Sequence, residues 1–306
     1  MVSTTIFLYP SDSDTVWLLL NNRFFVKYQN ALTIHQMKSI LILISLGAIS
    51  LLGSSCKDTT ETSAAAKEIN EGKELVMKSI EAHGGKDQWY ANGQLQFRWR
   101  YNMTDRGPDA VVDTTQTVDT TTLAVMHEVT DSPIKFGLNN GEAWLSPKGA
   151  DFGRPPRFWA LTPYYFLGIP FIFNDEGANF ELLTEPMAFE GKDYTQVKVT
   201  YDPDSGDAPD DYYVLLIDPE TFVTRGAYYT NTNKLLGRKT VGPPKFMTLD
   251  NLQDVSGVKL ASGHRTMKMI DGKITNQMRF TEVTDVKFLP KGTVDLNIPA
   301  PNLIIK

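Results

Sequence analysis

The clearest pattern in the chain is a strict alternation of apolar and polar residues in short segments, which predicts β-strands. Leu95–Met103 shows it best, with Leu, Phe, Trp, Tyr and Met at every second position and polar residues between them. Turn sequences such as Asn140-Gly141 and Asp271-Gly272 separate such segments, and their residues favour a positive φ. Long strands joined by tight turns predict an antiparallel meander of about ten strands.

A helix is predicted before the strands. In Ala66–His83 the apolar residues recur at helical spacing, with Val76 and Ile80 on the same face. Gly84-Gly85 follows directly, and glycine favours the left-handed conformation in which many helices end. The spacing therefore predicts one amphipathic helix over residues 66–83.

The segment Phe158–Phe173 breaks the strand pattern. It contains seven aromatic residues and no charged residue. Pro163, Gly168 and Pro170 are expected to prevent one continuous helix, because proline lacks the N–H that a helix needs and glycine weakens it. We expect one or two short helices laid against the sheet, which either fill the core or cover an apolar cavity.

The sequence from Met37 to Ser55 has the features of a bacterial export signal. Lys38 supplies a positive charge, an uncharged apolar run of 13 residues occupies 40–52, and small residues lead to Cys56. This arrangement predicts a lipoprotein signal peptide over 37–55, with lipid attached to Cys56. The alternative is a buried apolar helix followed by an ordinary cysteine.

The signal divides the rest of the chain. Residues 1–36 precede it and are interpreted as an extension that results from a start codon chosen too early, with Met37 as the true first residue. Residues 56–65 are small and polar and are predicted to form a flexible tether. Residues 66–306 are predicted to form a single β domain, whose proline-containing end, 295–306, lies along the surface.

Charge and cysteine content narrow the class of protein. The formal net charge is −6 and the pI is about 5.3, with no basic block, which argues against a nucleic-acid partner. Cys56 is the only cysteine. The domain must therefore be stable without a disulfide, even in an oxidising compartment.

The common catalytic motifs are missing from the sequence. It has no His-Glu-x-x-His pair, no Gly-x-Ser-x-Gly elbow, no phosphate loop and no dinucleotide fingerprint, so no metal or cofactor site is predicted. His83 is either a catalytic base beside flexible glycines or a histidine favoured at a helix end by the macrodipole. Arg98 and Arg100 either meet an anionic head group or are solvated charges.

An acidic loop is a further candidate that stays open. It either binds calcium through its oxygen atoms or forms a solvated hairpin tip, and its spacing does not match the twelve-residue calcium loop. The residues concerned are Asp202, Asp204, Asp207, Asp210 and Asp211, with Gly206 among them.

The order of these features resembles the LolA/LolB-like superfamily of lipoprotein carriers and receptors. The similar motifs are Ala82-His83-Gly84-Gly85 with Trp89, Asn140-Gly141-Glu142-Ala143-Trp144, Tyr165–Phe171 and Asp218-Pro219-Glu220-Thr221. Proteins of that superfamily form an unclosed β-barrel whose open side is plugged by helices. The resemblance therefore implies a curved antiparallel meander, with an N-terminal helix and short helices covering its concave side.

The resemblance also implies an apolar cavity that binds lipid or the acyl chain of a lipoprotein, without catalysis. The candidate lining residues are Trp99, Trp144, Phe158, Trp159, Tyr165, Phe166 and Phe171. One alternative is an envelope hydrolase that uses spatially paired carboxylates with His127 or His264. Another is a purely structural envelope lipoprotein.

The predicted anchor also suggests a location. Lipid on Cys56 would attach the protein to a membrane, and Lys57, rather than an aspartate, follows the cysteine. This combination resembles lipoproteins released to the outer membrane of Gram-negative bacteria. We expect the protein there, on the periplasmic side.

We predict that Cys56→Ala detaches the protein from the membrane or leaves it as an uncleaved precursor. Each buried methylene of an acyl chain contributes about 0.8 kcal/mol, so two or three chains hold a domain almost irreversibly. Cell fractionation measures this, because the wild type should sediment with the outer membrane and the variant should not. A variant that fractionates as the wild type does would contradict the predicted anchor.

Overall fold

The computed structural model describes residues 16–20, 24–28, 59–174, 177–202, 208, 210–232, 234–236 and 242–305. The chain forms two compact units, residues 1–57 and 58–306. In the first unit, β1 (Val16–Leu20) pairs with β2 (Phe24–Tyr28) as an antiparallel hairpin. The predicted signal peptide and Cys56 lie outside the described residues.

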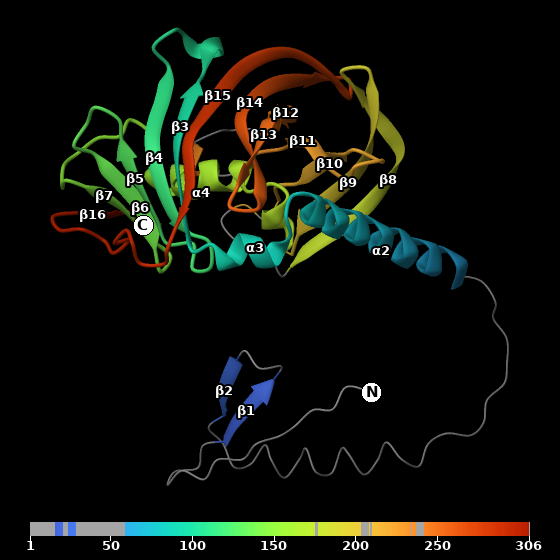
Figure 1. Cartoon of the computed structure of the whole chain (residues 1–306), viewed down its shortest axis with the longest axis horizontal. Helices are drawn as coiled ribbons and strands as arrows, with labels where there is room; N and C mark the ends of the chain where they lie inside the picture. The colour runs from blue at the N-terminus through green and yellow to red at the C-terminus, as the bar shows by residue number, and fades with distance from the viewer. Residues whose placement is uncertain are drawn as a thin grey trace. The chain divides into compact units, whose positions relative to one another are not determined.

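The second unit is built on one antiparallel sheet of fourteen strands, which is more than the ten expected. Its order is β16-β7-β6-β5-β4-β3-β15-β14-β12-β11-β10-β9-β8, and β13 pairs with β14 beside this path. The two end strands, β16 and β8, do not pair with each other, so the sheet is strongly curved but unclosed (Figure 1). The predicted fold class is confirmed.

The strands near the N-terminal side of this unit form the flatter part of the sheet. They are β3 (Gln94–Asn102), β4 (Val111–Asp119), β5 (Val125–Val129), β6 (Lys135–Asn139) and β7 (Glu142–Ser146). The others form the curved part, except for the last, which returns to pair with β7. They are β8 (Ala178–Phe189), β9 (Lys192–Tyr201), β10 (Tyr213–Ile217), β11 (Thr224–Tyr229), β12 (Lys245–Thr248), β13 (Asp250–Val255), β14 (Val258–Ile270), β15 (Lys273–Leu289) and β16 (Leu303–Ile305).

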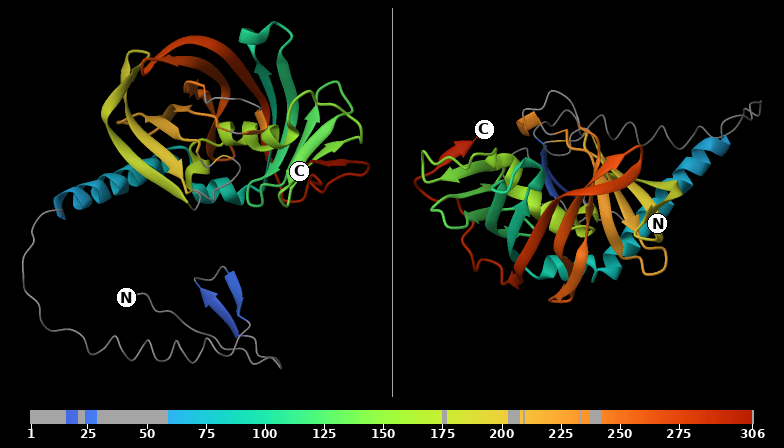
Figure 2. Two further views of the ribbon diagram at one scale, coloured as in Figure 1. Left: turned by 180° about the vertical axis from the view of Figure 1, so that it is seen from behind. Right: turned by 90° about the horizontal axis from the view of Figure 1, so that it is seen from above.

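Helices cover the concave face of the sheet. Helix α4 lies inside its curve and packs on β5, β6 and β7, and α2 runs along β8 and β9 (Figures 1 and 2). None of the helices in the described part of the chain combines the length and the hydrophobicity that a bilayer crossing requires. The helical segments are α2 (Thr59–Ala82), α3 (Lys86–Ala91), α4 (Pro156–Leu167), and the 3-10 turns η1 (Thr104–Arg106), η2 (Phe171–Asn174) and η3 (Lys234–Leu236).

The core lies between the sheet and these helices. Val76 and Ile80 of α2 and Trp89 of α3 are fully or almost fully buried there, at 0–1% exposure. They pack with the alternating inward residues of β3 and with the aromatic segment around η2. The amphipathic helix predicted at 66–83 therefore supplies its apolar face to this core, as its spacing indicates.

The first helix begins earlier than expected, at Thr59. Residues 59–65, predicted as part of a flexible tether, are helical. Glu61 and the alanines at 64–66 are good helix formers, and helical propensity here outweighs the small, polar character that suggested a tether. Residues 56–58 lie outside the described part of the chain.

The aromatic segment also differs in detail from the expectation. Pro155-Pro156 begins α4, where a missing N–H costs nothing, and the helix continues through Pro163 to end at Gly168. The hydroxyl of Thr162 donates to the carbonyl of Phe158 one turn earlier. Because Pro163 is buried, its packing offsets the helical hydrogen bond that it forfeits.

The two free edges of the sheet are irregular or short. In β8 the pairing register with β9 shifts between Leu183 and Met187, and Glu185-Pro186 occupies that bulge. At the other edge, β16 has only three residues. The C-terminal residues were expected to lie along the surface, but Leu303–Ile305 pairs with β7, and Leu296 is buried.

Trp144 packs directly on the backbone of Gly137 in the neighbouring strand. A β-carbon at residue 137 would lie 2.9 Å from the Trp144 ring and would clash with the carbonyl of Val125. Trp144 is fully buried, so the ring has no room to withdraw. Glycine at this position is therefore required by close packing.

We predict that Gly137→Ala lowers the free energy of unfolding by about 2 kcal/mol or more, the usual effect of overpacking a core. Chemical denaturation followed by tryptophan fluorescence measures the change. Gly242→Ala is the matched control, because nothing lies within 4 Å of a β-carbon there, and its stability should stay near that of the wild type. Equal stability of the two variants would contradict this account of Trp144.

Candidate functional site

A cavity of about 540 Å³ lies between α4 and the inner face of the sheet. One wall is a single face of the helix, formed by Phe158, Trp159, Thr162 and Phe166, which recur at helical spacing. The opposite wall comes from residues of β3, β11, β12 and β15 and from Met103, which follows β3, and its other apolar members include Trp99 and Met247. Its size and mixed lining are typical of a small-molecule site.

Polar contacts from side chains of the sheet fix the position of α4. The carbonyl of Ala160 accepts hydrogen bonds from His127 Nε2 at 2.8 Å and from Gln116 Nε2 at 2.9 Å. Thr114 bonds the other ring nitrogen of His127 at 3.0 Å, and the ring stacks on Phe136. The histidine therefore holds the helix in place, and the cavity beside it owes its shape to this contact.

Four of the seven predicted lining residues meet at this cavity. They are Trp99, Phe158, Trp159 and Phe166. The alternation in β3 and the lack of charge in the aromatic segment were the signals that identified them.

The other three predicted lining residues do not line the cavity. Trp144 is buried over Gly137, Phe171 stacks on Trp89 with ring centroids 4.6 Å apart, and Tyr165 packs against the main core. They were predicted together with the other four because an apolar segment shows burial without showing which buried surface faces a void. Each of the three fills core space instead.

Sequence reasoning missed the cationic residues of the lining. They are Arg106, Arg154, Lys245 and Arg279, and no acidic residue in the described ranges lines the cavity with them. For Arg279, the sequence offered one sign of an inward position, namely the alternation of polar and apolar residues around it in its strand. Arginine is nevertheless unexpected at an inward position. The other three come from loops or a strand end, which hydrophobic periodicity does not cover.

One of these cations is paired with an acid and buried. Arg279 donates two hydrogen bonds of 2.7 Å to the carboxylate of Asp105 and one of 3.1 Å to the hydroxyl of Tyr101. These hydrogen bonds hold the pKa of Asp105 below its usual value. The charge of Arg279 is therefore largely compensated within the protein.

Four buried polar atoms gather on the inner face of the sheet and have no hydrogen-bond partner in the described part of the chain. They are Trp99 Nε1, His264 Nε2, Thr266 Oγ1 and Thr281 Oγ1. His264 and Thr281 are opposite each other in the β14–β15 pairing, and the His264 and Trp99 ring centroids are 5.2 Å apart. Since Trp99 also lines the cavity, a neutral polar patch lies next to its apolar wall.

The remaining candidates from the sequence, His83, Arg98 and Arg100, form contacts within the protein. The ring of His83 bonds the carbonyl of Lys259 and the N–H of Thr224, each at 3.1 Å, which joins the end of α2 to β14 and β11. Arg98 forms a bidentate pair with Asp113, and Arg100 pairs with Glu282. Neither arginine is left for an external anion.

The acidic loop is only partly described. Asp211 accepts hydrogen bonds from Thr232, and Asp202 accepts one from Asn179. Asp204, Gly206 and Asp207 lie outside the described residues. Within the described ranges, no group of three or more His, Cys, Asp or Glu side chains is arranged to hold a metal ion.

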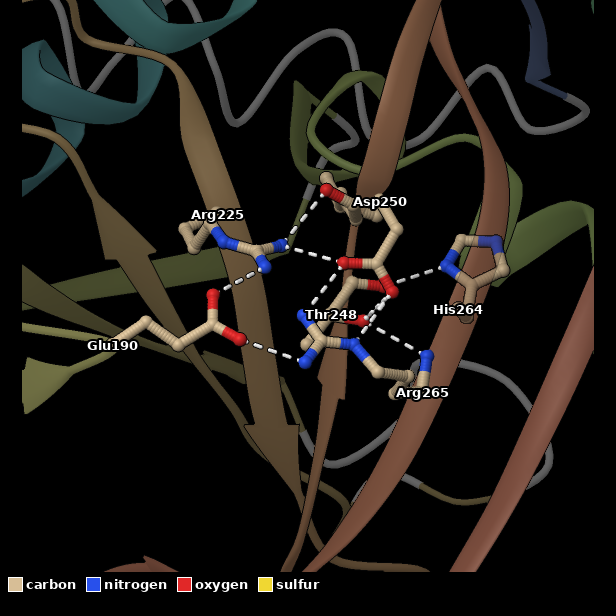
Figure 3. A network of polar contacts seen from close by, with 7 residues as sticks. Glu190, Arg225, Thr248, Asp250, His264 and Arg265 are labelled. Atoms are coloured by element: carbon tan, nitrogen blue, oxygen red, sulfur yellow. Dashed lines mark hydrogen bonds and ion pairs between the residues drawn. The ribbon is translucent and has the colours of Figure 1, made fainter. Parts of the chain in front are cut away.

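A second depression, more open and about 950 Å³ in volume, lies beside a network of charged residues. There Arg225 and Arg265 lie between the carboxylates of Glu190 and Asp250, with ion-pair distances of 2.7–3.0 Å (Figure 3). Burial alone would raise the pKa of Asp250, but hydrogen bonds from Arg265 and Thr248 outweigh it and lower the pKa to about 2. The acids and bases of this region neutralise one another.

A family model, described as a family of unknown function (DUF6503), matches residues 59–240. The matched stretch contains α2, α4, β3 and β11, whereas β12 and β15, which also line the cavity, lie beyond it. A comparison with curated proteins gives no match.

Three solved structures illustrate the similarity in fold. A domain described as an outer-membrane lipoprotein-sorting protein from Vibrio parahaemolyticus has 12% identity and a TM-score of 0.46, and covers 74% of this chain and 95% of its own. A LolA superfamily protein from Nitrosomonas europaea has 11% identity and a TM-score of 0.45, covering 71% and 93%. A DUF1329 family protein from Desulfovibrio piger has 11% identity and a TM-score of 0.44, and covers 72% of this chain and 93% of its own. At these values the likeness carries no argument about ligand or activity.

We predict that the protein loses stability on acidification from about pH 6.5 to about pH 4. Burial lowers the pKa of His83, His127 and His264 to about 4, whereas an unfolded histidine has a pKa near 6.5. In this window the unfolded chain binds protons that the folded chain does not, so the free energy of unfolding falls as the pH falls. Each histidine contributes a slope of about 1.4 kcal/mol per pH unit.

Urea unfolding at a series of pH values measures this slope. His127→Gln should reduce the slope by the contribution of one histidine, about 1.4 kcal/mol per pH unit. Thr114→Val removes a hydrogen-bond partner of the same ring, so it should lower stability at neutral pH and leave the slope unchanged. An unchanged slope in His127→Gln would mean that His127 is not held neutral in the fold.

Proposed function

We propose a function for this chain from the geometry of its cavity. The chain belongs to DUF6503, a family of unknown function, so the family itself supplies none. The protein binds a hydrophobic ligand, a lipid or the acyl chain of a lipoprotein, between α4 and the sheet, and does so without catalysis. The observation that carries this proposal is the 540 Å³ cavity beside α4, whose mixed lining includes several aromatic side chains and two methionines.

The walls of the cavity suit a flexible apolar chain. Aromatic rings present large flat surfaces at a small loss of conformational entropy, and the two methionines, Met103 and Met247, are flexible enough to adapt to different chain shapes. Burying such a chain contributes about 0.8 kcal/mol for each methylene. A ligand with several methylenes in the cavity would therefore bind without any specific polar contact.

Binding is favoured over the alternative of an envelope hydrolase by the state of the polar groups. His83, His127 and His264 bond backbone or hydroxyl groups, and among the described residues none of the three bonds a carboxylate. The clustered carboxylates Glu190 and Asp250 are held by arginines. A hydrolase would need a carboxylate or histidine directed at a substrate.

The proposed location follows from the sequence. The protein is anchored through lipid on Cys56, in the outer membrane of a Gram-negative bacterium and facing the periplasm, and its partners are lipids or lipoproteins. An anchored domain with an apolar cavity meets its ligand in or near the same membrane, where such ligands are concentrated.

We predict that Phe166→Asp abolishes the binding of an apolar fluorescent probe to the delipidated protein. Phe166 lines the cavity and its ring centroid lies 5.0 Å from that of Tyr229, so the variant places a carboxylate in the apolar wall. Because Phe166 is only half-buried, the cost to folding should be about 1–3 kcal/mol. Probe titration and thermal unfolding are measured on the same sample.

The matched control is Phe288→Asp. Phe288 is also half-buried and contacts Trp89 edge to face, but it does not line the cavity. This variant should lose stability to a similar degree and still bind the probe. A wild type that binds no probe, or a Phe166→Asp variant that simply unfolds, would mean that the segment is ordinary core.

A further inference from the structure

The charges around the cavity are unbalanced. Among the described residues, its lining contains four cationic side chains and no carboxylate, although the whole chain has a formal net charge of −6. Arg279 is compensated by Asp105. Arg106 and Arg154, by contrast, form no hydrogen bond or ion pair with a carboxylate within the described part of the chain, although the charge of Arg106 also acts on Asp105.

Arg154 is the more constrained of these two residues. It is half-buried just before α4, and its guanidinium lies 5.7 Å from the ring centre of Trp159. Burial lowers its pKa, and the charges of Arg106 and Arg279 lower the pKa further. Arg154 therefore lies close enough to Arg106 and Arg279 for their positive charges to act on it, and the charge of Arg279 is already paired with Asp105.

The cations and the apolar walls lie at different depths. Arg106 is exposed and Arg154 half-buried, whereas Trp99 and Met247 are 2% and 3% exposed. Arg106 and Arg154 therefore lie nearer to solvent than Trp99 and Met247, whereas Arg279 is itself buried. The polar atoms at the inner side, around His264 and Thr281, are neutral because His264 stays unprotonated when buried.

We propose that the ligand of this cavity is an amphiphile with an anionic head group, a carboxylate or a phosphate, which Arg154 and Arg106 bind while the chain points toward Trp99 and Met247. The proposal rests on the binding function proposed above and narrows its ligand class. Arginine presents paired N–H donors that match both kinds of anion, and an anion there would compensate the charge of Arg154, which forms no ion pair with a described carboxylate. An uncharged or cationic head group would leave the charge of Arg154 uncompensated.

The test compares ligands that share one chain and differ in the head group. The full chain carrying Cys56→Ala, stripped of bound lipid, is loaded with an apolar fluorescent probe, and displacement is measured with dodecanoate, dodecyl phosphate, dodecanol and dodecylamine. We expect dodecanoate or dodecyl phosphate to bind about tenfold or more tightly than dodecanol, the effect of one charge-assisted hydrogen bond. Dodecylamine should bind more weakly than dodecanol.

The ratio between the two anions identifies the source of the head group. Preference for dodecanoate indicates a free fatty acid, and preference for dodecyl phosphate indicates a phospholipid; either supports the proposal. In Arg154→Gln and in Arg106→Gln, the ratio of anion to dodecanol affinity should fall toward one. Arg157→Gln removes the same charge three residues away, from a side chain that does not line the cavity, and should keep the wild-type ratio.

The outcomes separate this proposal from the one it rests on. If dodecanol displaces the probe as well as the anions do, the protein binds apolar chains without selecting charge, and only the head-group proposal fails. If the wild type binds neither probe nor amphiphile, both fail. A preference for anions that survives in both arginine variants would overturn the assignment to Arg154 and Arg106.

Discussion

The structure depends on one constraint: an unclosed sheet must bury its concave face. A closed barrel covers its interior with its own strands, but here β16 and β8 do not meet, and the inner face would be open to water on one side. Helices α2, α3 and α4 and the η2 turn meet this requirement. Their apolar residues join those of the strands in a single main core.

The same constraint explains why polar contacts inside the unit are so specific. A helix lying on a concave surface can slide or tilt unless something fixes it, and apolar packing has little direction. His127 and Gln116 fix α4 through one carbonyl, and His83 fixes the end of α2 to two strands. These buried histidines therefore have a structural role, because they hold the helices in fixed positions. As a result, the space left between α4 and the sheet has a defined shape.

The architecture could be predicted because its determinants are local. Alternation in Leu95–Met103 and the paired turn residues Asn140-Gly141 specify strands and hairpins within a few residues, and both turn residues do adopt a positive φ. Strands without that pattern were missed. The short β12 and the polar β13 gain their stability from pairing with β14, which no local pattern shows.

The site was predictable only in part for a related reason. Aromatic character identified Phe158, Trp159 and Phe166, but it could not separate them from Phe171, whose ring faces Trp89 instead of a void. The cationic residues Arg106 and Arg154 come from separate turns, and only the fold brings them together. Long-range convergence of this kind leaves no trace in the spacing of residues along the chain.

An open sheet also has two free edges, and free edges invite other chains to add strands. The bulge at Glu185-Pro186 interrupts the row of backbone donors and acceptors along β8, and β16 is too short to template a long partner. Both edges are thus poor sites for edge-to-edge association between copies. The open sheet thus leaves its inner face accessible beside α4 while its two edges disfavour the addition of further strands.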